Sequence, residues 1–415
     1  MRGSRPITGR LCCVTARSPI RVLIGSPAAG AIAVGAVDGD PPAGVILLDL
    51  GADHPSRAGL LELRIWLAED STEVDQQTIA RAEVIVGAMH RGAEKLYEVR
   101  DYRQILMLAD RHDWQAPAAA ELAIAAACER MLGLEPPLRA QWLRTLLAEH
   151  HRALSHLGFL NYLWHRRGLG SPVPEVREQL RRQLQRWTGN RVHPMINRLG
   201  GLAADVDHGW LGVESELAKT IMDIADLAGE LIMDPALAET SGRIPLLGPE
   251  LVDAYGVTGP AARAAGVDLD LRRQQPYLCY RDLAPELEPT DQLVTALDGS
   301  ALARLAIMIT ELRSSARMII TMVDRVRDLP GPVSVKLGKI VKLPEGEIYL
   351  ATEAPLGQAG CYLVSRGEKT PWRLKLRTPS FNNVAALEAL LPGCRVGDLE
   401  LVLASTGYVV GDIDK

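Results

Sequence analysis

The stretch PEGEIYLATEAPLGQAGCYLVSRGEKTPWRLKLR, residues 344–377, decides the fold class because its periodicity differs from that of the middle of the chain. Apolar residues alternate with polar ones along it, and a period of two is typical of β-strands. The same alternation recurs in LELVLAS near the end of the chain. The pattern predicts four strands, at residues 347–352, 360–365, 372–377 and 399–405. We therefore expect a small antiparallel sheet here.

The middle of the chain has a helical pattern instead. Alanine, leucine and arginine, which favour helices, are frequent, and apolar residues recur at intervals of three and four. The predicted helices cover residues 118–134, 138–164, 174–187, 213–233 and 297–326. The segment 242–282, rich in glycine, proline and arginine, is predicted to be irregular.

Strands are predicted again before the helices. GVILLDLG (residues 44–51) and GLLELRIWLA (residues 59–68) are typical of two strands joined by the proline-containing turn ADHPSR. The uncharged stretch at 22–37 is shorter than the ~20 apolar residues that a membrane helix needs. It predicts two short strands or a loose extension, and no segment is predicted to span a membrane.

Strands that flank a helical centre predict an α+β fold. In it, a central bundle of long helices is flanked by small antiparallel sheets from the N- and C-terminal parts. One integrated domain is expected over about residues 51–415. Within the chain we expect an N-terminal extension at 1–43, a β-rich part at 44–115, a helical core at 116–332 and a C-terminal β-rich part at 333–415.

Composition limits the class of protein. The 415 residues are 47% hydrophobic and 23% charged, with a net charge of −5, so the chain is globular and has no basic field to attract nucleic acid. The six cysteines are widely spread and form no C-x-x-C motif. This spacing excludes a disulfide framework, a zinc site and an iron–sulfur cluster bound by this chain alone. We expect reduced, mostly buried thiols in a cytoplasmic protein.

Four polar clusters each combine a histidine with an arginine or a carboxylate in a predicted loop or helix start. They are Asp53-His54-Pro55 and residues 90–95 (HRGAEK), 110–114 (DRHDW) and 193–201 (HPMINRLGG). Loops on rigid scaffolds often carry binding sites. A structural interpretation competes: Asp110 and Asp113 can complement a helix start, with Arg111 as their surface partner, and His54 can simply sit in a turn.

Sequence motifs for other chemistries are missing. The chain contains no G-x-S-x-G, no G-x-x-x-x-G-K-[ST] and no H-E-x-x-H. His150, His151 and His156 lie on one predicted helix, but the last two are five residues apart and fall on different faces. They are a weak pattern for a metal site.

Four segments match known family patterns in the same order along the chain. HRGAEKLYEVRDYRQ resembles H-R-G-x-E-K…R-x-Y-x-Q, and GNRVHPMINRLGG resembles G-x-R-M-H-x-x-x-x-R-x-G-G. GVTGPAARAAGVDLDLRRQQPY resembles G-L-T-G-P…R-x-S-G…D-L-R-K-x-x-P-Y. The C-terminal stretch resembles G-E-x-Y-x-x-x-E-A-P-x-G, Y-L-V-S-x-G, R-x-P-S-F-x-N-L and G-D-V-D-R.

These patterns resemble the D subunit (49 kDa type) of NADH-quinone oxidoreductase, respiratory complex I, a relative of the large subunit of nickel–iron hydrogenases. The resemblance runs from about Gly51 to Lys415. It implies a hydrogenase large-subunit-like fold and a peripheral place on the cytoplasmic side of a membrane. The implied partners are an iron–sulfur small subunit (B-type), a C-type subunit and membrane-arm subunits. Quinone would bind at the subunit interface, the 4Fe-4S cluster would lie in the small subunit, and NADH would bind another subunit.

The resemblance also assigns site residues. The family's R-x-D-Y motif falls on Arg111, Asp113 and Trp114, so Arg111 is expected to face the partner's cluster, as is His193. A cation there would favour the reduced, more negative cluster. The quinone-pocket positions are His54, Ala58 and Trp114. Further family-motif positions are His90, Arg91, Glu94, Asp113, Arg198, Asp412 and Asp414. The chain itself is expected to bind no metal or cofactor, and no catalytic residue is assigned.

Departures from the family pattern gather on the quinone side. Trp114 replaces the tyrosine, Ala58 replaces the second histidine of H-P-x-x-H-G, and Gly407 replaces an acidic residue. Bases, His165 and Arg166, stand near the position of a supporting carboxylate. The C-x-x-C pairs that hold nickel and iron in hydrogenases are missing, which excludes hydrogen chemistry.

These departures imply a divergent member whose quinone chemistry is altered or lost, since each missing donor typically costs a polar site ~1–3 kcal/mol. Two alternatives stay open. The first is full quinone reduction with Trp114 and His54 as substitute donors. The second is a non-catalytic scaffold in a complex I-like or hydrogenase-related membrane oxidoreductase.

Overall fold

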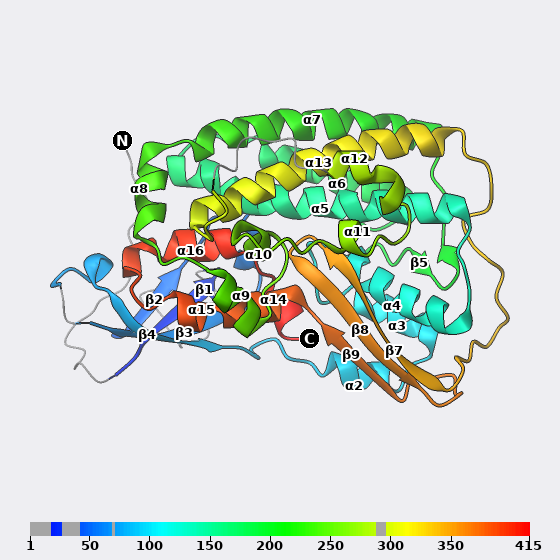
Figure 1. The fold of residues 1–415 in the computed structure, drawn as a ribbon, viewed down its shortest axis with the longest axis horizontal. Coiled ribbons are helices and arrows are strands. Elements are labelled where there is room, and N and C mark those ends of the chain that lie inside the picture. The colour runs from blue at the N-terminus through cyan, green and yellow to red at the C-terminus, as the bar shows by residue number, and fades with distance from the viewer. Residues whose placement is uncertain (1–17, 27–41, 69–70, 288–295) are drawn as a thin grey trace.

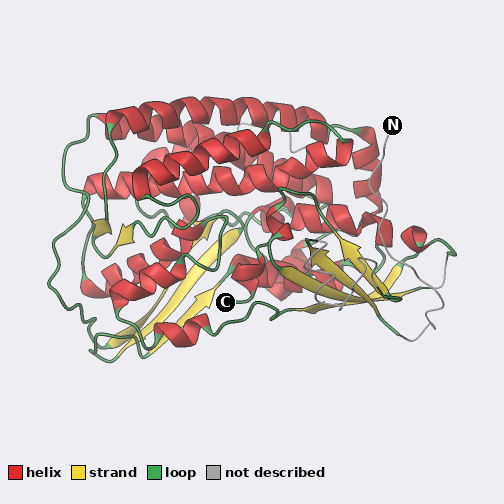
Figure 2. Cartoon of the chain, turned by 180° about the vertical axis from the view of Figure 1, so that it is seen from behind, coloured by secondary structure: helices red, strands yellow, loops and turns green. Residues whose placement is uncertain are grey.

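The structure is a computed structural model that describes residues 18–26, 42–68, 71–287 and 296–415. A layer of long helices lies above two separate sheets, one from each end of the chain, and the C-terminus lies between these sheets (Figure 1). The view from behind shows the same separation beneath the helices (Figure 2). The predicted α+β class is confirmed.

Part of the sequence-based expectation falls outside the described residues. Cys12, Cys13 and most of the expected N-terminal extension belong to it. The other four cysteines are free and buried, as predicted: Cys128, Cys279, Cys361 and Cys394. In the described ranges, no helix combines the length and the apolar character that crossing a bilayer requires.

The predicted long helices are confirmed. They are α4 (Pro117–Leu132), α5 (Leu138–Arg167), α6 (Val173–Thr188), α7 (His208–Ile232) and α13 (Ala301–Arg327). α13 packs along both α7 and α5. α7 begins earlier than predicted because the side chain of Asp207 accepts the backbone N–H of Trp210 at 2.6 Å and caps its first turn.

The N-terminal sheet has the strand order β2-β1-β3-β4. Its strands are β1 (Ile20–Gly25), β2 (Val45–Leu48), β3 (Leu60–Leu67) and β4 (Ile79–Ile85). β1 and β2 are parallel, so the expectation of a purely antiparallel sheet is wrong here. β1 is an inner strand, and the boundary expected at residue 43 does not separate it from the sheet. β4, with the sequence IARAEVI, is absent from the predicted strands. Two of its alternating apolar residues are alanines, which are depleted in strands.

The C-terminal sheet consists of β7 (Gly346–Ala354), β8 (Gly357–Ser365) and β9 (Arg373–Arg377), antiparallel in chain order. Three of the four strands predicted there are confirmed. The fourth, at 399–405, is wrong: these residues lie in helix α16 (Leu399–Thr406). All of them except Glu400 are buried. A short apolar run that is buried on every side carries no reliable period.

Short helices lie in and next to the segment predicted to be irregular, residues 242–282, and occupy about half of it. They are α8 (Pro235–Arg243), α9 (Pro249–Tyr255), α10 (Pro260–Ala264), α11 (Leu271–Gln274), the 3₁₀ helix η3 (Tyr280–Leu283) and α12 (Ala284–Leu287). The remaining elements are η1 (Pro55–Arg57), η2 (Val74–Gln76), α2 (Ala93–Tyr97), α3 (Tyr102–Ala109), β5 (Asn197–Arg198), β6 (Gly201–Leu202), α14 (Pro379–Ala385), α15 (Leu387–Leu390), η4 (Val396–Asp398) and α17 (Val410–Ile413). Prolines in the first turn start α8, α9, α10 and α14, where their missing N–H is no loss.

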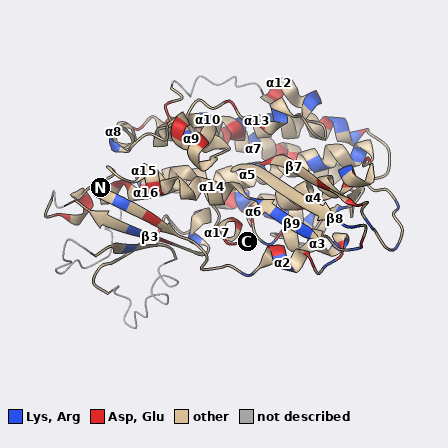
Figure 3. Ribbon diagram, turned by 60° about the horizontal axis from the view of Figure 1, so that its bottom comes forward, with Lys and Arg blue, Asp and Glu red and all other residues tan. Residues whose placement is uncertain are grey.

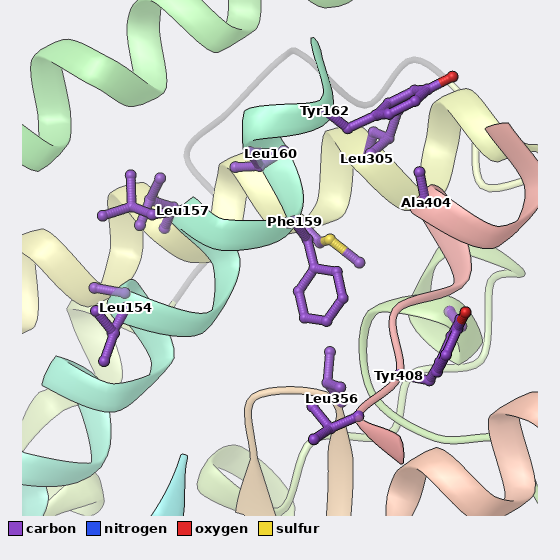
Figure 4. Packing of buried hydrophobic residues seen from close by; sticks show 14 of the residues in the cluster. Leu154, Leu157, Phe159, Leu160, Tyr162, Leu305, Leu356, Ala404 and Tyr408 are labelled. Carbon is purple, nitrogen blue, oxygen red and sulfur yellow. The ribbon is translucent and has the colours of Figure 1, made fainter. Parts of the chain in front are cut away.

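An apolar core joins the helical layer to the C-terminal segment. Phe159 of α5 is fully buried, and its ring points towards Leu356, beside the chain that carries Tyr408 (Figure 4). Tyr408 is also fully buried. Burial of such aromatic rings dominates core energetics, so this packing fixes the C-terminal segment against α5.

A network of buried charges lies where α5, α10, α11 and α13 meet β7. Its members are Glu149, Arg152, Arg263, Asp270, Arg272, Glu311 and Glu353. The carboxylate of Glu149 lies 3.2 Å from Nε of Arg152 and 3.4 Å from Nη1 of Arg272. Every member has an opposite charge within reach, which is the condition under which charges are tolerated inside a protein. The network ties the C-terminal sheet to the helices.

Candidate functional site

The polar segment Asp110–Trp114 connects the end of α3 to the start of α4. Oδ1 of Asp113 accepts the backbone N–H groups of Gln115 (3.0 Å) and Ala116 (3.1 Å). Asp113 therefore closes the turn that leads into α4, but it is not part of the helix start: α4 has no side-chain cap and no acidic residue in its first turn. Asp110 differs, because it follows the C-terminal end of α3 and is buried.

Arg111 and His193 meet at Asp110. Nε of Arg111 lies 3.0 Å from the Asp110 carboxylate, and Nδ1 of His193 donates to the Asp110 backbone oxygen at 2.9 Å. Nη2 of Arg111 also lies 3.3 Å from the sulfur of Met195, whose φ of 43° is rare for a residue with a side chain. Burial and the charge of Arg111 lower the pKa of His193. The two residues predicted to face a cluster thus lie together, and both reach the surface.

Buried carboxyl groups lie behind these two side chains. Glu121 of α4 is fully buried and accepts the backbone N–H of Asn197 at 2.8 Å. Burial raises the pKa of Asp110 to about 6 and that of Glu121 to about 8. Burial, followed by the charge of Asp412, raises the pKa of Asp113 to about 7. Near neutral pH Glu121 is therefore mostly protonated and Asp113 is partly protonated.

We expect the contribution of Glu121 to the free energy of unfolding to rise as the pH falls from about 8 towards about 5. Buried neutral histidines such as His54 and His112 act in the opposite direction, so this contribution is read from the difference between wild type and a Glu121 variant. The folded chain protonates Glu121 in this window, whereas the unfolded chain does so only near pH ~4.3. The stabilisation from Glu121 is fully present below the pKa that this residue has in the unfolded chain. It is lost as the pH rises through the pKa that Glu121 has in the folded chain. Urea titrations at both ends of the window measure the free energy of unfolding of the wild type and of Glu121→Gln. The difference between the two proteins should change by at least about 1 kcal/mol from one pH to the other.

Glu216→Gln is the matched control for that experiment, because Glu216 is an exposed glutamate on α7. Its pH dependence should equal that of the wild type. If Glu121→Gln also kept the full wild-type slope, Glu121 would not be the group that titrates.

His54 opens η1 and is buried. Its Nδ1 accepts the backbone N–H of Ser56 at 3.3 Å, so the neutral ring carries its proton on Nε2. Nε2 is buried and has no hydrogen-bond partner among the described residues. The ring lies edge-on to Phe159, with 5.4 Å between centroids. Burial, then the charges of Arg177 and His165, lower the pKa of His54 to about 3, so this ring is a neutral N–H donor.

The C-terminal segment lies between Trp114 and the loop that carries Ala58. On one side, Oγ of Ser56 donates to the backbone oxygen of Tyr408 at 3.0 Å. On the other, a Cβ on Gly411 would lie 2.2 Å from the Trp114 ring, so only glycine fits. Ala58 is exposed and Trp114 is half-buried. The quinone-pocket positions expected from the sequence thus lie on two sides of one short segment.

His165 and Arg166, the bases near the position of an expected carboxylate, lie in the last turn of α5. The ring of exposed His165 lies against Gly51, where a Cβ would be 3.1 Å from its Cγ. Arg166 follows it at the end of α5 and donates to the side chain of Thr240 at 3.0 Å. At buried Gly407, a Cβ would meet the side chain of Leu356 at 3.0 Å, so the packing leaves little room for an acidic side chain.

The family-motif residues connect distant segments. The carboxylates of Glu94, Asp412 and Asp414 accept the backbone N–H groups of Leu376, Ser380 and Gly87, at 2.9, 3.1 and 2.7 Å respectively. The guanidinium groups of Arg91 and Arg198 donate to the backbone oxygens of Arg111 and Met195, at 2.9 and 2.6 Å. His90 is exposed in the loop before α2. These contacts are structural.

A surface pocket of about 550 Å³ lies between the loop before α2, the C-terminal sheet and the C-terminus. The charged residues in its lining are Glu94, Lys375, Arg377, Asp414 and Lys415, and His90 also lines it. The basic residues of β9 and the charges of α2 appear as coloured segments beside the C-terminus (Figure 3). His54, Ala58 and Trp114 do not line this pocket, so it is distinct from the quinone-pocket positions.

The histidines of α5 are structural. Nδ1 of His150 lies 2.6 Å from the Glu214 carboxylate, and Nε2 of His156 lies 2.9 Å from that of Glu311. Within the described parts of the chain, no group of three or more His, Cys, Asp or Glu side chains could hold a metal ion.

Two important residues are missing from the sequence-based candidates. Arg177 on α6 contacts both the His54 loop and Gln115. The sequence does carry a signal for it, because a lone arginine interrupts the apolar positions Val173, Val176 and Leu180 of that helix. Gln115 carries no comparable signal, since its role depends on a partner far away in the sequence.

Comparisons with known proteins give a consistent result. The family described as respiratory-chain NADH dehydrogenase, 49 Kd subunit, matches residues 173–342 and 335–415. The D 2 subunit of NADH-quinone oxidoreductase from Streptomyces griseus subsp. griseus is 46% identical over 375 residues, 89% of this chain and 92% of that protein. The D 1 subunit of the same enzyme from Streptomyces coelicolor is 45% identical, over 89% of this chain and 95% of that protein.

A solved structure is similar as well. It is a chain of the membrane-bound sulfane sulfur reductase, an archaeal respiratory membrane complex. The TM-score is 0.77 at 28% sequence identity, and the match covers 86% of this chain and 94% of that one.

Proposed function

Since the chain belongs to the family of 49 kDa (D) subunits of the respiratory-chain NADH dehydrogenase, we propose that it forms an electron-transfer interface with an iron–sulfur small subunit. Electrons would pass there from the small subunit's terminal cluster to quinone, in a membrane-associated NADH-quinone oxidoreductase. The observation that carries the proposal is the meeting of Arg111 and His193 around Asp110 at the surface. A cation and a titratable ring on a surface suit a neighbour that gains negative charge on reduction.

The remaining partners follow from the same proposal. A C-type subunit and membrane-arm subunits would hold the chain at the cytoplasmic side of the membrane, and NADH would be oxidised in another subunit. The chain would contribute residues to the quinone pocket without binding a cofactor alone. Its neutral His54 supports this role. The Nε2–H has no partner in the part of the chain that the structure describes, and a quinone carbonyl oxygen is a hydrogen-bond acceptor.

A second candidate function is a scaffold that joins the small subunit to a membrane arm without reducing quinone. Ala58 and Trp114 favour it, since neither offers the donor that the family pattern has at its position. The lack of space for a side chain at Gly407 also favours the scaffold function. The similar chain from a sulfane sulfur reductase indicates that this fold also occurs in complexes named for another acceptor.

Quinone reduction by the purified complex, with NADH and a ubiquinone or menaquinone analogue, separates these functions. The double variant Trp114→Tyr, Ala58→His restores both family donors. If the pocket is otherwise intact, we expect it to raise the rate by roughly tenfold, the effect of about one recovered hydrogen bond. Ala58 is exposed, so a histidine fits there without repacking.

Trp114→Tyr, Ala52→His is the matched control, because Ala52 is an exposed alanine at the start of the same loop. It should leave the rate near that of Trp114→Tyr alone. If neither the wild-type complex nor the double variant reduced ubiquinone or menaquinone analogues, electron transfer to quinone would be contradicted. The scaffold function would then be supported.

A further inference from the structure

Arg177 is a buried cation that contacts no carboxylate among the described residues, although the Asp53 carboxylate acts on it from farther away. It lies on the inner face of α6 and is 4% exposed. Its guanidinium donates to three acceptors, the backbone oxygens of Leu154 (3.2 Å) and Asp53 (3.1 Å) and the side-chain oxygen of Gln115 (2.6 Å). All three are neutral. Throughout the described residues, no carboxylate oxygen lies within 4.0 Å of its nitrogens.

Four other arginines in the interior are paired differently, whereas Arg304 also lacks a carboxylate partner within the described ranges. Arg144, Arg152, Arg263 and Arg272 each contact at least one carboxylate. Burying an unpaired charge is costly, and burial lowers the pKa of Arg177 to about 9. Arg304 bears the same cost, so the feature that sets Arg177 apart is its contact with two separate loops.

The position of the Arg177 guanidinium is tightly restricted. A Cβ on Gly158 of α5 would lie 2.9 Å from Cζ of Arg177 and 2.7 Å from Cγ of Pro55. The guanidinium therefore occupies a slot next to the bare backbone of α5. From there it reaches two loops at once: Asp53 precedes His54, and Gln115 follows Trp114.

We propose that Arg177 is the positioning residue of the quinone pocket, an inference that rests on the proposed function. It fixes the His54 loop relative to the Trp114 loop, so that both present their polar atoms to the same ligand. Its charge provides a positive potential beside His54, which favours a carbonyl oxygen that gains negative charge as electrons arrive. It also favours the neutral form of His54, whose Nε2–H then stays available as a donor.

Three variants of the purified complex test this role. Arg177→Met removes the charge and the three hydrogen bonds. Arg177→Lys keeps the charge, but its compact ammonium group lacks the extended planar fork that reaches acceptors in three segments. Arg304→Met is the matched control, since Arg304 is also fully buried without a carboxylate partner and contacts Gly299 and Ser405 instead. The readouts are kcat and KM for a short-chain ubiquinone analogue, and hydrogen exchange at the amides of Ser56 and Ala116.

We expect Arg177→Met to lower kcat/KM by about tenfold or more and Arg304→Met by less than about twofold, at similar losses of thermal stability. Arg177→Lys should be intermediate, and millimolar guanidinium should partly restore Arg177→Met alone. Exchange at Ser56 and Ala116 should accelerate only in the Arg177 variants, because their amides bond within the two loops.

The two proposals fail in different ways. If Arg177→Met lost no more activity than Arg304→Met and left both amides protected, Arg177 would not be a positioning residue, although quinone reduction would stand. If the wild-type complex reduced no quinone while both amides still lost protection in Arg177→Met, the proposed function would be overturned and the positioning of the loops supported.

Discussion

Replacing Glu149 by alanine is expected to lower the free energy of unfolding by about 3–5 kcal/mol, the cost of leaving a buried charge without its partner. Glu149 has no exposed surface. Its carboxylate accepts hydrogen bonds from the hydroxyls of Tyr280 and Ser315, both at 2.6 Å, and contacts Arg152 and Arg272. These positive neighbours hold the pKa of Glu149 below its usual value.

Urea unfolding of the isolated chain measures this effect. Glu149→Gln keeps the shape and should cost less than alanine but more than a surface change. Glu239→Ala removes the exposed partner of Arg243 and should change stability by less than about 1 kcal/mol. A Glu149→Ala variant as stable as Glu239→Ala would show that the buried network does not hold the C-terminal sheet to the helices.

Replacing Arg111 by methionine is expected to lower the midpoint potential of the partner's iron–sulfur cluster by roughly 30–90 mV. A unit charge at about 8 Å, with an effective dielectric constant of about 20, contributes ~2 kcal/mol to the reduced state. For a one-electron couple this corresponds to about 90 mV, and partial exposure of Arg111 reduces it. The side chain of Arg111 is 43% exposed in the free chain and would be covered by the partner.

A redox titration of the purified complex, followed by electron paramagnetic resonance, gives the potential. Arg111→Lys keeps the charge and should shift it little. Arg182→Met, at an exposed arginine of α6, controls for net charge and should leave it unchanged. An unchanged potential in Arg111→Met would mean that Arg111 does not face the cluster.

The long elements could be predicted from the sequence, and the short ones could not. Helices such as α5 and α13 repeat their pattern over many turns, so the signal accumulates. α16 has eight residues and is buried on nearly every side. The alternation of its leucines therefore does not indicate a strand. The parallel pairing of β1 and β2 depends on contacts between distant segments, which no local pattern encodes.

The residues of the candidate site could also be predicted only in part. Resemblance is sufficient to select Arg111 and His193, and the structure adds that they share Asp110. The role of Arg177 depends on where α6 packs, because its three acceptors come from three different segments. Spacing along the sequence carries no information on such a contact.

Arg111 and His193 are proposed to face a cluster in a neighbouring subunit. Electron cryomicroscopy of the purified complex tests it most directly, through the distance from these side chains to the nearest iron–sulfur cluster. We expect both side chains within about 10 Å of the cluster, where a charge still acts on it. Finding the two side chains in solvent, or against a subunit without a cluster, would contradict the account.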